Sequence, residues 1–374
     1  MRAELSKKLL LLTASLAFAL TLIEAMFRLV GYAQGIDYRL YLKELKNSDR
    51  LPRALFRADP QTTAALAPNT EVLAVTSDFS VIYRTNSKGL RDQEYAYEKP
   101  QDRLRILALG DSITFGEGVP YGARFTDIPE DELDGLEIIN ASVPGWGLDS
   151  ELVYLAREGL RYAPDWVVIF INFVGLTREL PGLVRDGRVE LSAQPPLSPR
   201  NQGVAGGGDT WYLRPDDPMF KERSVLTRSS YALSYLTFRV NLAQRRGALE
   251  QQDAARWQQK NAGRRTPDVT TDLPEASPRV RLVLEKFVEL SKANGFRLMI
   301  INISSWASLS FVPTVDPSIV YHDLAPLLVA ESRKRPISFK YDPHYTPETN
   351  RLLGRELVNI LRPLVEEHRA QPGR

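Results

Sequence analysis

Ser112 follows a short apolar segment and precedes a helix-like segment, a setting typical of a serine nucleophile. Residues 105–109 are apolar enough to form a buried parallel strand. Gly110 then ends the strand, and Asp111 and Ser112 stand where a helix begins. This order places the Ser112 hydroxyl at the carboxyl edge of a sheet, where open α/β folds bind ligands. It also places the Ser112 N–H at a helix N-terminus, where it can stabilise an anion. The alternative is that Asp111 or Ser112 is simply a helix cap.

A nucleophilic serine needs a base and a group that orients the base. Of the three histidines in the chain, His344 has the most suitable setting, because it precedes a predicted C-terminal helix. Thr346 and Pro347 are a good N-cap and first residue for that helix. Pro343 keeps the preceding segment extended, so Asp342 and His344 project to the same side. The spacing predicts that Asp342 orients His344; the alternative is a surface histidine beside a loop carboxylate.

The other two histidines are less suited to this role. His322 stands between Tyr321 and Asp323, at or near the start of a predicted helix, and is expected to be structural. His368 lies in the predicted C-terminal tail and is expected to be solvated.

Two further segments contain candidate donors for an oxyanion hole, each at the end of a predicted strand. Gly145 lies in the glycine-containing segment that follows residues 137–140, where a backbone N–H can approach a ligand closely. Asn172 ends the strand at 166–172, so its side-chain amide can reach the same sheet edge. Taken singly, Gly145 could be a turn glycine and Asn172 a capping residue. Together with the Ser112 N–H they form a set of three donors.

The order of these residues resembles that of the SGNH (GDSL-like) hydrolase family. Gly110-Asp111-Ser112 matches the first block, Gly145 the second, Asn172 the third, and Asp342 with His344 the last. The resemblance covers roughly residues 101–365, with a weaker lead-in at 83–91. Two blocks depart from the family pattern: the usual Asn-Asp is Asn172-Phe173, and Asp-x-x-His is shortened to Asp-x-His. The shorter form is similar to branches that handle acyl groups on envelope polysaccharides.

The resemblance implies a flavodoxin-like three-layer α/β/α fold with catalytic Ser112, His344 and Asp342. It assigns the oxyanion hole to Ser112, Gly145 and Asn172. The implied activity is that of a serine esterase or acylhydrolase acting on a small O-acyl group, with acetyl expected. The implied substrate is an envelope glycan, a glycolipid or a small ester, and no cofactor or metal is required. Two alternatives stay open: an O-acyltransferase with the same residues, and a non-catalytic scaffold of an envelope polysaccharide system.

The segments that must position these residues alternate between strands and helices. Strands are predicted at 105–109, 137–140, 166–172 and 297–303, and three of them are apolar on both faces. This composition favours a mostly parallel sheet covered by helices. Helical periodicity is present at 149–162, with Asp149 as the expected N-cap, at 278–294, and after Pro347. We assign residues 101–366 to this hydrolase-like domain and 367–374 to a tail.

Residues 182–276 interrupt the alternation after the third strand. Residues 195–208 are rich in proline and glycine and predict an irregular loop, and 231–264 predicts one or two helices. We interpret the whole segment as an insertion over the active-site edge. It is a candidate lid or a surface for an envelope protein partner. Residues 35–100 are expected to form a cap region, with a hairpin of 70–75 and 79–85.

Residues 1–34 predict a membrane segment. Basic residues precede an apolar run at 9–23, and Glu24 and Arg28 are spaced to pair on one helical face, which extends the span to about Ala33. No good small-x-small cleavage site follows the run, which favours an uncleaved anchor over a cleaved signal peptide. The positive-inside rule places the rest of the chain outside the cytoplasm, on the periplasmic side of the inner membrane in a Gram-negative cell.

Composition excludes several classes of protein. The chain has 374 residues, enough for one large or two modest domains. Its net charge of +2 gives no support for nucleic-acid binding. With no cysteine it has no disulfide, thiolate metal site, cysteine nucleophile or lipoprotein acylation site. Trp146, Phe173 and Trp211 are candidates either for stacking on sugar rings or for packing.

Overall fold

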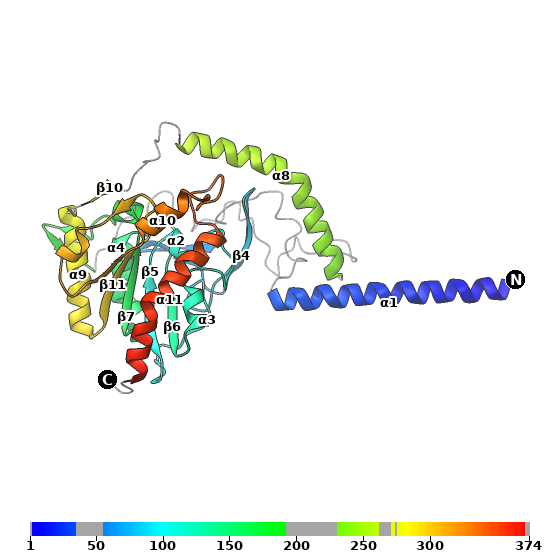
Figure 1. Cartoon of the computed structure of the whole chain (residues 1–374), viewed down its shortest axis with the longest axis horizontal. Helices are drawn as coiled ribbons and strands as arrows, with labels where there is room; N and C mark the ends of the chain where they lie inside the picture. Colours follow the sequence, from blue (N-terminus) through cyan, green and yellow to red (C-terminus); the bar gives the residue numbers. More distant parts are fainter. Residues whose placement is uncertain (1, 35–54, 192–229, 262–270, 274, 371–374) are drawn as a thin grey trace.

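A computed structural model of the chain describes residues 2–34, 55–191, 230–261, 271–273 and 275–370 (Figure 1). Trp211 and the loop expected at 195–208 lie outside these residues. The central sheet has five parallel strands in the order β13-β11-β7-β5-β6. They are β5 (Leu104–Leu109), β6 (Leu136–Asn140), β7 (Trp166–Ile171), β11 (Arg297–Asn302) and β13 (Val320–Asp323). Numbered along the chain this order is 2-1-3-4-5, the flavodoxin-like arrangement, as predicted.

Helices cover both faces of the sheet, which explains why its inner strands are apolar throughout. Alternate residues, such as Leu107 and Val167, pack against α4 (Leu148–Arg157) and α9 (Pro278–Asn294). The intervening residues, such as Ile106 and Val168, pack against α11 (Pro347–Ala370), which Figure 1 shows running along the sheet. The short helix α3 (Asp127–Glu132) lies beside α11. The predicted three-layer α/β/α architecture is confirmed.

The structure corrects three local predictions. Val320–Asp323 form β13 beside β11, so His322 lies in an edge strand and not at the start of a helix. The N-cap of α4 is Gly147, not Asp149. The Asp149 carboxylate instead accepts a hydrogen bond from the N–H of Leu180 (2.7 Å) and pairs with Arg279. The predicted helix 149–162 also breaks after Arg157, and a 3-10 turn follows at Gly159–Tyr162.

Two hairpins pack against the segments that follow β5 and β6. The predicted hairpin is present as β3 (Glu71–Val75) and β4 (Ser80–Arg84), and β1 (Phe56–Asp59) pairs with β2 (Thr63–Leu66). Their apolar side chains share a core with Phe115 and Trp146. The Trp146 ring is buried and its Nε1 donates to the carbonyl of Ala64 (2.8 Å). Trp146 is therefore a packing residue.

The remaining elements are short, apart from two long helices. The short ones are α2 (Ser112–Phe115), α5 (Phe173–Leu176), β8 (Val184–Arg185), β9 (Arg188–Val189), β10 (Thr271–Asp272), β12 (Ala307–Ser308), η6 (Val312–Thr314) and α10 (Ala325–Ser332). Helix α8 (Tyr231–Asn261) is continuous. Helix α1 (Arg2–Gln34) projects away from the sheet in Figure 1. Its segment Glu4–Leu29, with a mean hydropathy of 2.1, is long and apolar enough to cross a membrane.

Candidate active site

Ser112 is the first residue of α2, directly beyond the carboxyl end of β5. Asp111 caps this helix, because its Oδ1 accepts a hydrogen bond from the N–H of Ile113 (3.0 Å). Gly116 ends the helix in the left-handed conformation, with φ at 78°. The capping role therefore belongs to Asp111, and the Ser112 hydroxyl is available for another contact.

That contact is with His344, 232 positions further along the chain. The Ser112 Oγ lies 2.7 Å from His344 Nε2. The other ring nitrogen, Nδ1, is hydrogen-bonded to Asp342 Oδ1, which also accepts the backbone N–H of His344 (2.9 Å). All three residues are buried. The structure thus joins the predicted serine, histidine and aspartate into one chain of hydrogen bonds, an arrangement suited to moving a proton from the hydroxyl to the imidazole.

Asn172 reaches the same sheet edge from the end of β7. It is the N-cap of α5, and its Oδ1 accepts the N–H of Gly175 (3.0 Å). Its Nδ2 donates to Asp111 Oδ2 (2.8 Å), which joins the end of β7 to the residue next to Ser112. The side chain is therefore fixed at both ends of its amide.

Gly145 lies in the loop between β6 and α4, with φ at 94°. The loop is tied to the end of β5 by a hydrogen bond from the N–H of Val143 to the carbonyl of Gly110 (3.2 Å). Arg178, which the sequence analysis did not identify, makes a second link. Its Nη1 donates to the carbonyl of Trp146 (2.9 Å) and to Asp111 Oδ2 (3.0 Å). The loops after β5, β6 and β7 therefore meet at one edge, the switch point of a 2-1-3-4-5 sheet.

Glu117 is a second residue that the sequence analysis missed. Its side chain is fully buried, and its Oε2 lies 3.4 Å from His344 Nε2. Gly116 and Gly118 flank it, both with positive φ, and such a Gly-Glu-Gly turn after a nucleophile helix was the available sequence signal. Ligand atoms of Glu117, Asp342 and His344 lie within 4.8 Å of one another, a separation that suits a cation site. Because both ring nitrogens of His344 already contact Ser112 and Asp342, this geometry favours proton transfer over metal binding.

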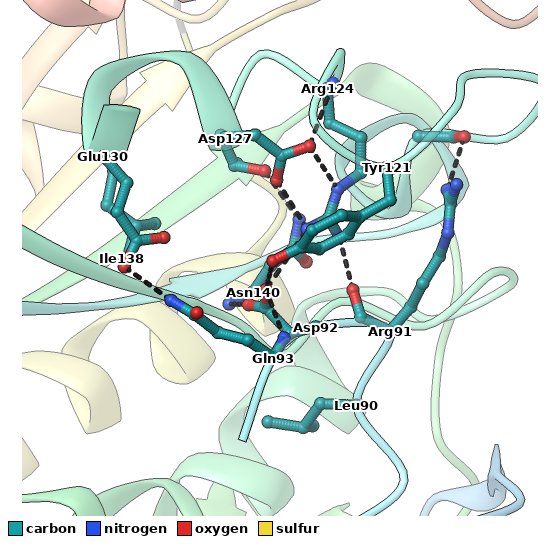
Figure 2. Close-up of polar contacts among 12 residues, drawn as sticks. Leu90, Arg91, Asp92, Gln93, Tyr121, Arg124, Asp127, Glu130, Ile138 and Asn140 are labelled. Carbon is teal, nitrogen blue, oxygen red and sulfur yellow. Dashed lines mark hydrogen bonds and ion pairs between the residues drawn. The ribbon is translucent and has the colours of Figure 1, made fainter. Parts of the chain in front are cut away.

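A buried polar cluster behind the site holds the loop that follows Ser112. Figure 2 shows Arg124 pointing between Asp127 and Asp92, with ion-pair distances of 2.9 Å from Nε and 3.3 Å from Nη2 respectively. Arg124 also donates to the carbonyl of Arg91 (2.6 Å). Arg91 in turn donates to the carbonyls of Phe115 and Gly116, both at 2.8 Å. These contacts give a physical reason for the weaker motif at 83–91, since it supplies the support for α2.

Two carboxyl groups of this cluster are poorly solvated. Burial raises the pKa of Asp92 to about 6, against the opposing effect of Arg124. Burial also raises the pKa of Glu130 to about 7. The hydroxyl of Tyr95 donates to Glu130 Oε1 (2.8 Å). The pKa values of both carboxyl groups are therefore shifted toward neutral pH.

Phe173 occupies the place where the family pattern has an aspartate. Its backbone N–H donates to Ser304 Oγ (2.9 Å), and its ring lies edge-on to Trp306 with centroids 4.5 Å apart. Both rings are only partly buried. The departure from the pattern thus replaces a charge with an aromatic pair next to Asn172.

The fold and these contacts define an α/β protein with a buried serine–histidine–aspartate chain at the switch point of its sheet. No family model and no curated protein matches the chain. Among solved structures it is similar to a lipolytic G-D-S-L family member from Veillonella parvula, at 12% identity and TM-score 0.35, covering 69% of this chain and 98% of that one. It is also similar to the esterase EstA from Pseudoalteromonas sp., at 12% identity and TM-score 0.35, covering 70% and 99%. A third is the acetyl xylan esterase AlAXEase, at 11% identity and TM-score 0.34, covering 69% and 99%. Identity and TM-score are low in all three, so these likenesses do not assign a function to the chain.

Proposed function

We propose that this chain is a serine esterase of the SGNH type that removes a small O-acyl group, acetyl in the first instance. The observation that carries the proposal is the hydrogen-bonded chain from Ser112 Oγ through His344 to Asp342. A buried histidine oriented by a carboxylate and in contact with a serine hydroxyl is the arrangement that activates a serine nucleophile.

In the proposed reaction His344 Nε2 takes the Ser112 proton as Oγ attacks the ester carbonyl. The carbonyl oxygen becomes an oxyanion, for which the N–H groups of Ser112 and Gly145 and an N–H of Asn172 are the assigned donors. The protonated His344 then gives its proton to the departing alcohol, leaving an acyl group on Ser112. A water molecule, deprotonated by His344, attacks this acyl group, releases the carboxylic acid and restores the serine. Asp342 stabilises the imidazolium in both halves of the reaction.

The proposed substrate is an acylated glycan or glycolipid of the cell envelope. The partly exposed rings of Phe173 and Trp306 support this choice, because aromatic side chains at the edge of a site can stack on sugar rings. The second support for an envelope substrate is the proposed position of the chain at the membrane. Glu24 of α1 accepts hydrogen bonds from the N–H groups of Tyr231 (2.7 Å) and Ala232 (3.0 Å), so α1 is attached to the folded chain. We propose that α1 is an uncleaved anchor and that the hydrolase-like domain lies outside the cytoplasm.

The test compares the full-length wild type with Ser112→Ala on p-nitrophenyl acetate, butyrate and octanoate. We expect Ser112→Ala to lower kcat by more than about 1,000-fold, and wild-type turnover to fall as the acyl chain lengthens. Ser150→Ala, a buried serine in α4, is the matched control and is expected to keep its activity. Equal rates for wild type and Ser112→Ala would rule out the proposed nucleophile. Turnover that rises with chain length would contradict the small-acyl specificity.

An O-acyltransferase is separated from an esterase in the same samples by following the acyl group. We expect free acetate to accumulate from an acetylated glycan in proportion to serine-dependent turnover. Transfer of the acetyl group to an added glycan in place of release would show that a sugar hydroxyl, not water, reaches the acyl-enzyme.

A further inference from the structure

The carboxylate of Glu24 on α1 contacts the first turn of α8, and the rings of Phe27 and Tyr235 pack beside it. Glu24 accepts hydrogen bonds from the N–H groups of Tyr231 (2.7 Å) and Ala232 (3.0 Å) and from the hydroxyl of Ser230 (2.8 Å). Arg28 donates to the same carboxylate (2.7 Å), as its i,i+4 spacing predicts. A carboxylate at this place satisfies N–H groups that a helix start leaves open and complements the positive end of its dipole.

The position of Glu24 sets the depth at which α8 begins. The apolar segment of α1 ends at Leu29, five residues beyond Glu24. At 1.5 Å per residue, Glu24 lies about 7.5 Å inside that end. An amphipathic helix in the membrane interface buries its apolar face about 5–10 Å into the boundary between headgroups and acyl chains. The start of α8 is therefore at the depth of an interfacial helix, if α1 spans the bilayer as proposed above.

One face of α8 near this start is apolar and exposed. Leu233, Leu236 and Val240 are spaced by three and four residues, so they share a helical face, and their exposed fractions are 39%, 52% and 53%. Tyr231 and Ser234, by contrast, are buried. An exposed stripe of large aliphatic side chains is unfavourable in water and indicates a partner.

The charge of α8 indicates which partner. The helix carries five basic residues, Arg239, Arg245, Arg246, Arg256 and Lys260, and two acidic residues, Glu250 and Asp253. Residues 231–240 contain one charged residue, Arg239, and the other basic residues follow at 245–260. A basic residue beside an apolar stripe, with no acidic residue in the same segment, suits an anionic lipid surface. Figure 1 shows the first half of α8 leaving the side of α1 and the second half turning toward the sheet domain.

We propose that the first third of α8, residues 231–240, lies in the membrane interface, with Leu233, Leu236 and Val240 in contact with lipid. This inference rests on the proposal that α1 is a membrane anchor and goes beyond it, because it assigns a second, independent lipid-binding surface. The partner is the bilayer itself.

The C-terminal part of α8, at Glu250 and Asp253, contacts the loop that carries the proposed catalytic aspartate and the turn between β3 and β4. Glu250 accepts hydrogen bonds from Lys340 Nζ (2.6 Å) and from the hydroxyl of Tyr341 (3.1 Å). Asp253 accepts the N–H of Ser77 (2.8 Å). Because Tyr341 is followed directly by Asp342, α8 runs from the membrane to the edge of the candidate active site. A lipid-bound α8 thereby fixes the orientation of that edge relative to the bilayer.

The chain contains no cysteine, so single cysteines can be introduced and spin-labelled in the full-length protein. The samples are Leu236→Cys and Val240→Cys in vesicles of phosphatidylethanolamine and phosphatidylglycerol. Leu16→Cys, exposed on the apolar part of α1, is the lipid reference, and Gln251→Cys, exposed on the polar half of α8, is the water reference. Power saturation in oxygen and in a water-soluble nickel chelate reports the environment of each label. Hydrolysis of p-nitrophenyl acetate by the same samples tests the proposed activity independently of the label environment. A rate equal to that of the wild type also shows that the labelled variant is folded.

We expect the oxygen-to-nickel accessibility ratio at Leu236 and Val240 to lie well above that at Gln251 and below that at Leu16. A ratio at Leu236 equal to that at Gln251 would overturn the proposal. So would a water-exposed label at Leu16, because α1 would then not span the bilayer, whatever the esterase assay gives. Dipolar broadening between Leu236 labels would also overturn it, since the stripe would then bind a second copy of the chain.

Discussion

The Glu117 carboxylate lies 3.4 Å from His344 Nε2, the same ring nitrogen that contacts the Ser112 hydroxyl at 2.7 Å. Asp342 contacts the opposite nitrogen of the ring. One imidazole is therefore placed between two buried carboxylates. A negative charge at this distance in a buried site stabilises the positively charged ring that forms when the serine loses its proton.

Replacing Glu117 with glutamine removes that charge while it keeps the size of the side chain. We expect kcat for p-nitrophenyl acetate to fall by about 10-fold or more, which corresponds to ~1.4 kcal/mol of lost stabilisation, with KM little changed. The acid limb of the rate profile is expected to move to lower pH. Without the nearby negative charge, protonation of the His344 imidazole is less favourable, so the neutral form that acts as the base persists to lower pH. Both quantities come from kinetics between pH 5 and 9.

The matched control for Glu117→Gln is Glu151→Gln. Glu151 is also buried, on α4, and burial raises its pKa well above the usual range, so its neutral form is already favoured. We expect this variant to leave the pH profile unchanged. An equal displacement of the acid limb in both variants would mean that Glu117 does not act through His344.

Asp342→Asn tests the orientation of the imidazole. Asparagine keeps the shape of the side chain, but it no longer holds His344 with the proton on Nδ1 and does not stabilise the charged ring. We expect kcat to fall by about 1,000- to 10,000-fold with little change in KM. Asp316→Asn, at an exposed pair with Lys292, is the control. A variant that retains more than a tenth of the wild-type kcat would remove Asp342 from the proposed mechanism.

Gly145 and Gly175 offer a matched pair for testing the proposed oxyanion hole. A Cβ at either position would meet nothing within 4 Å, so neither alanine introduces a clash. Of these two glycines, only Gly145 has a positive φ. A non-glycine residue in this conformation costs about 1–2 kcal/mol, which favours a shift of the backbone and of its N–H. We expect Gly145→Ala to lower kcat by about 10- to 100-fold and Gly175→Ala to change it little. Equal kinetics for both variants would argue against Gly145 as a donor.

The stability of the protein is expected to fall as the pH rises through the range set by Glu130. Its pKa is about 7 in the folded chain, against 4.5 for the ordinary group, because burial disfavours the charged form. Between these values the folded state holds more protons than the unfolded state, so a rise in pH favours unfolding. The contribution is present below about pH 4.5 and is lost as the pH passes 7, with an upper limit of ~3 kcal/mol.

Glu130→Gln removes this dependence and keeps an acceptor for the hydroxyl of Tyr95. We expect the difference in Tm between pH 5.5 and pH 8 to become smaller in the variant than in the wild type, by several degrees. Differential scanning calorimetry of both proteins at the two pH values measures it. An unchanged difference would show that Glu130 is not the group responsible.

Much of the proposed site was predictable because its signals are local. The Asp342-Pro343-His344 segment fixes its own geometry through the proline, and each of Ser112, Gly145 and Asn172 follows an apolar strand. Strands that are buried on both faces are continuous apolar runs, which are easy to recognise in a sequence. In a parallel sheet the carboxyl ends of these strands lie at one edge, so the residues that follow them come together. The hydrogen bond between Ser112 and His344 is the physical result of that topology.

The parts that were missed depend on distant contacts or on weak patterns. The four residues of β13 are all only partly buried, so the segment around His322 lacks the apolar run of the inner strands. Glu117 lies between two left-handed glycines, and the Gly-Glu-Gly pattern shows that the chain turns there but not that the carboxylate faces His344, 227 positions away. Asp149 pairs with Arg279, 130 positions away, and does not cap its own helix. The pairing of Glu24 with Arg28 was predictable from spacing, but the contact of Glu24 with Tyr231 was not.

The contact of Glu24 with α8 has a consequence for maturation of the protein. Proteolytic processing after Ala33 would remove the carboxylate that completes the first turn of α8, the helix whose Glu250 contacts Lys340 and Tyr341. The N-terminal segment would then be more than an address for export. With α1 retained, as proposed above, it would be part of the mature fold.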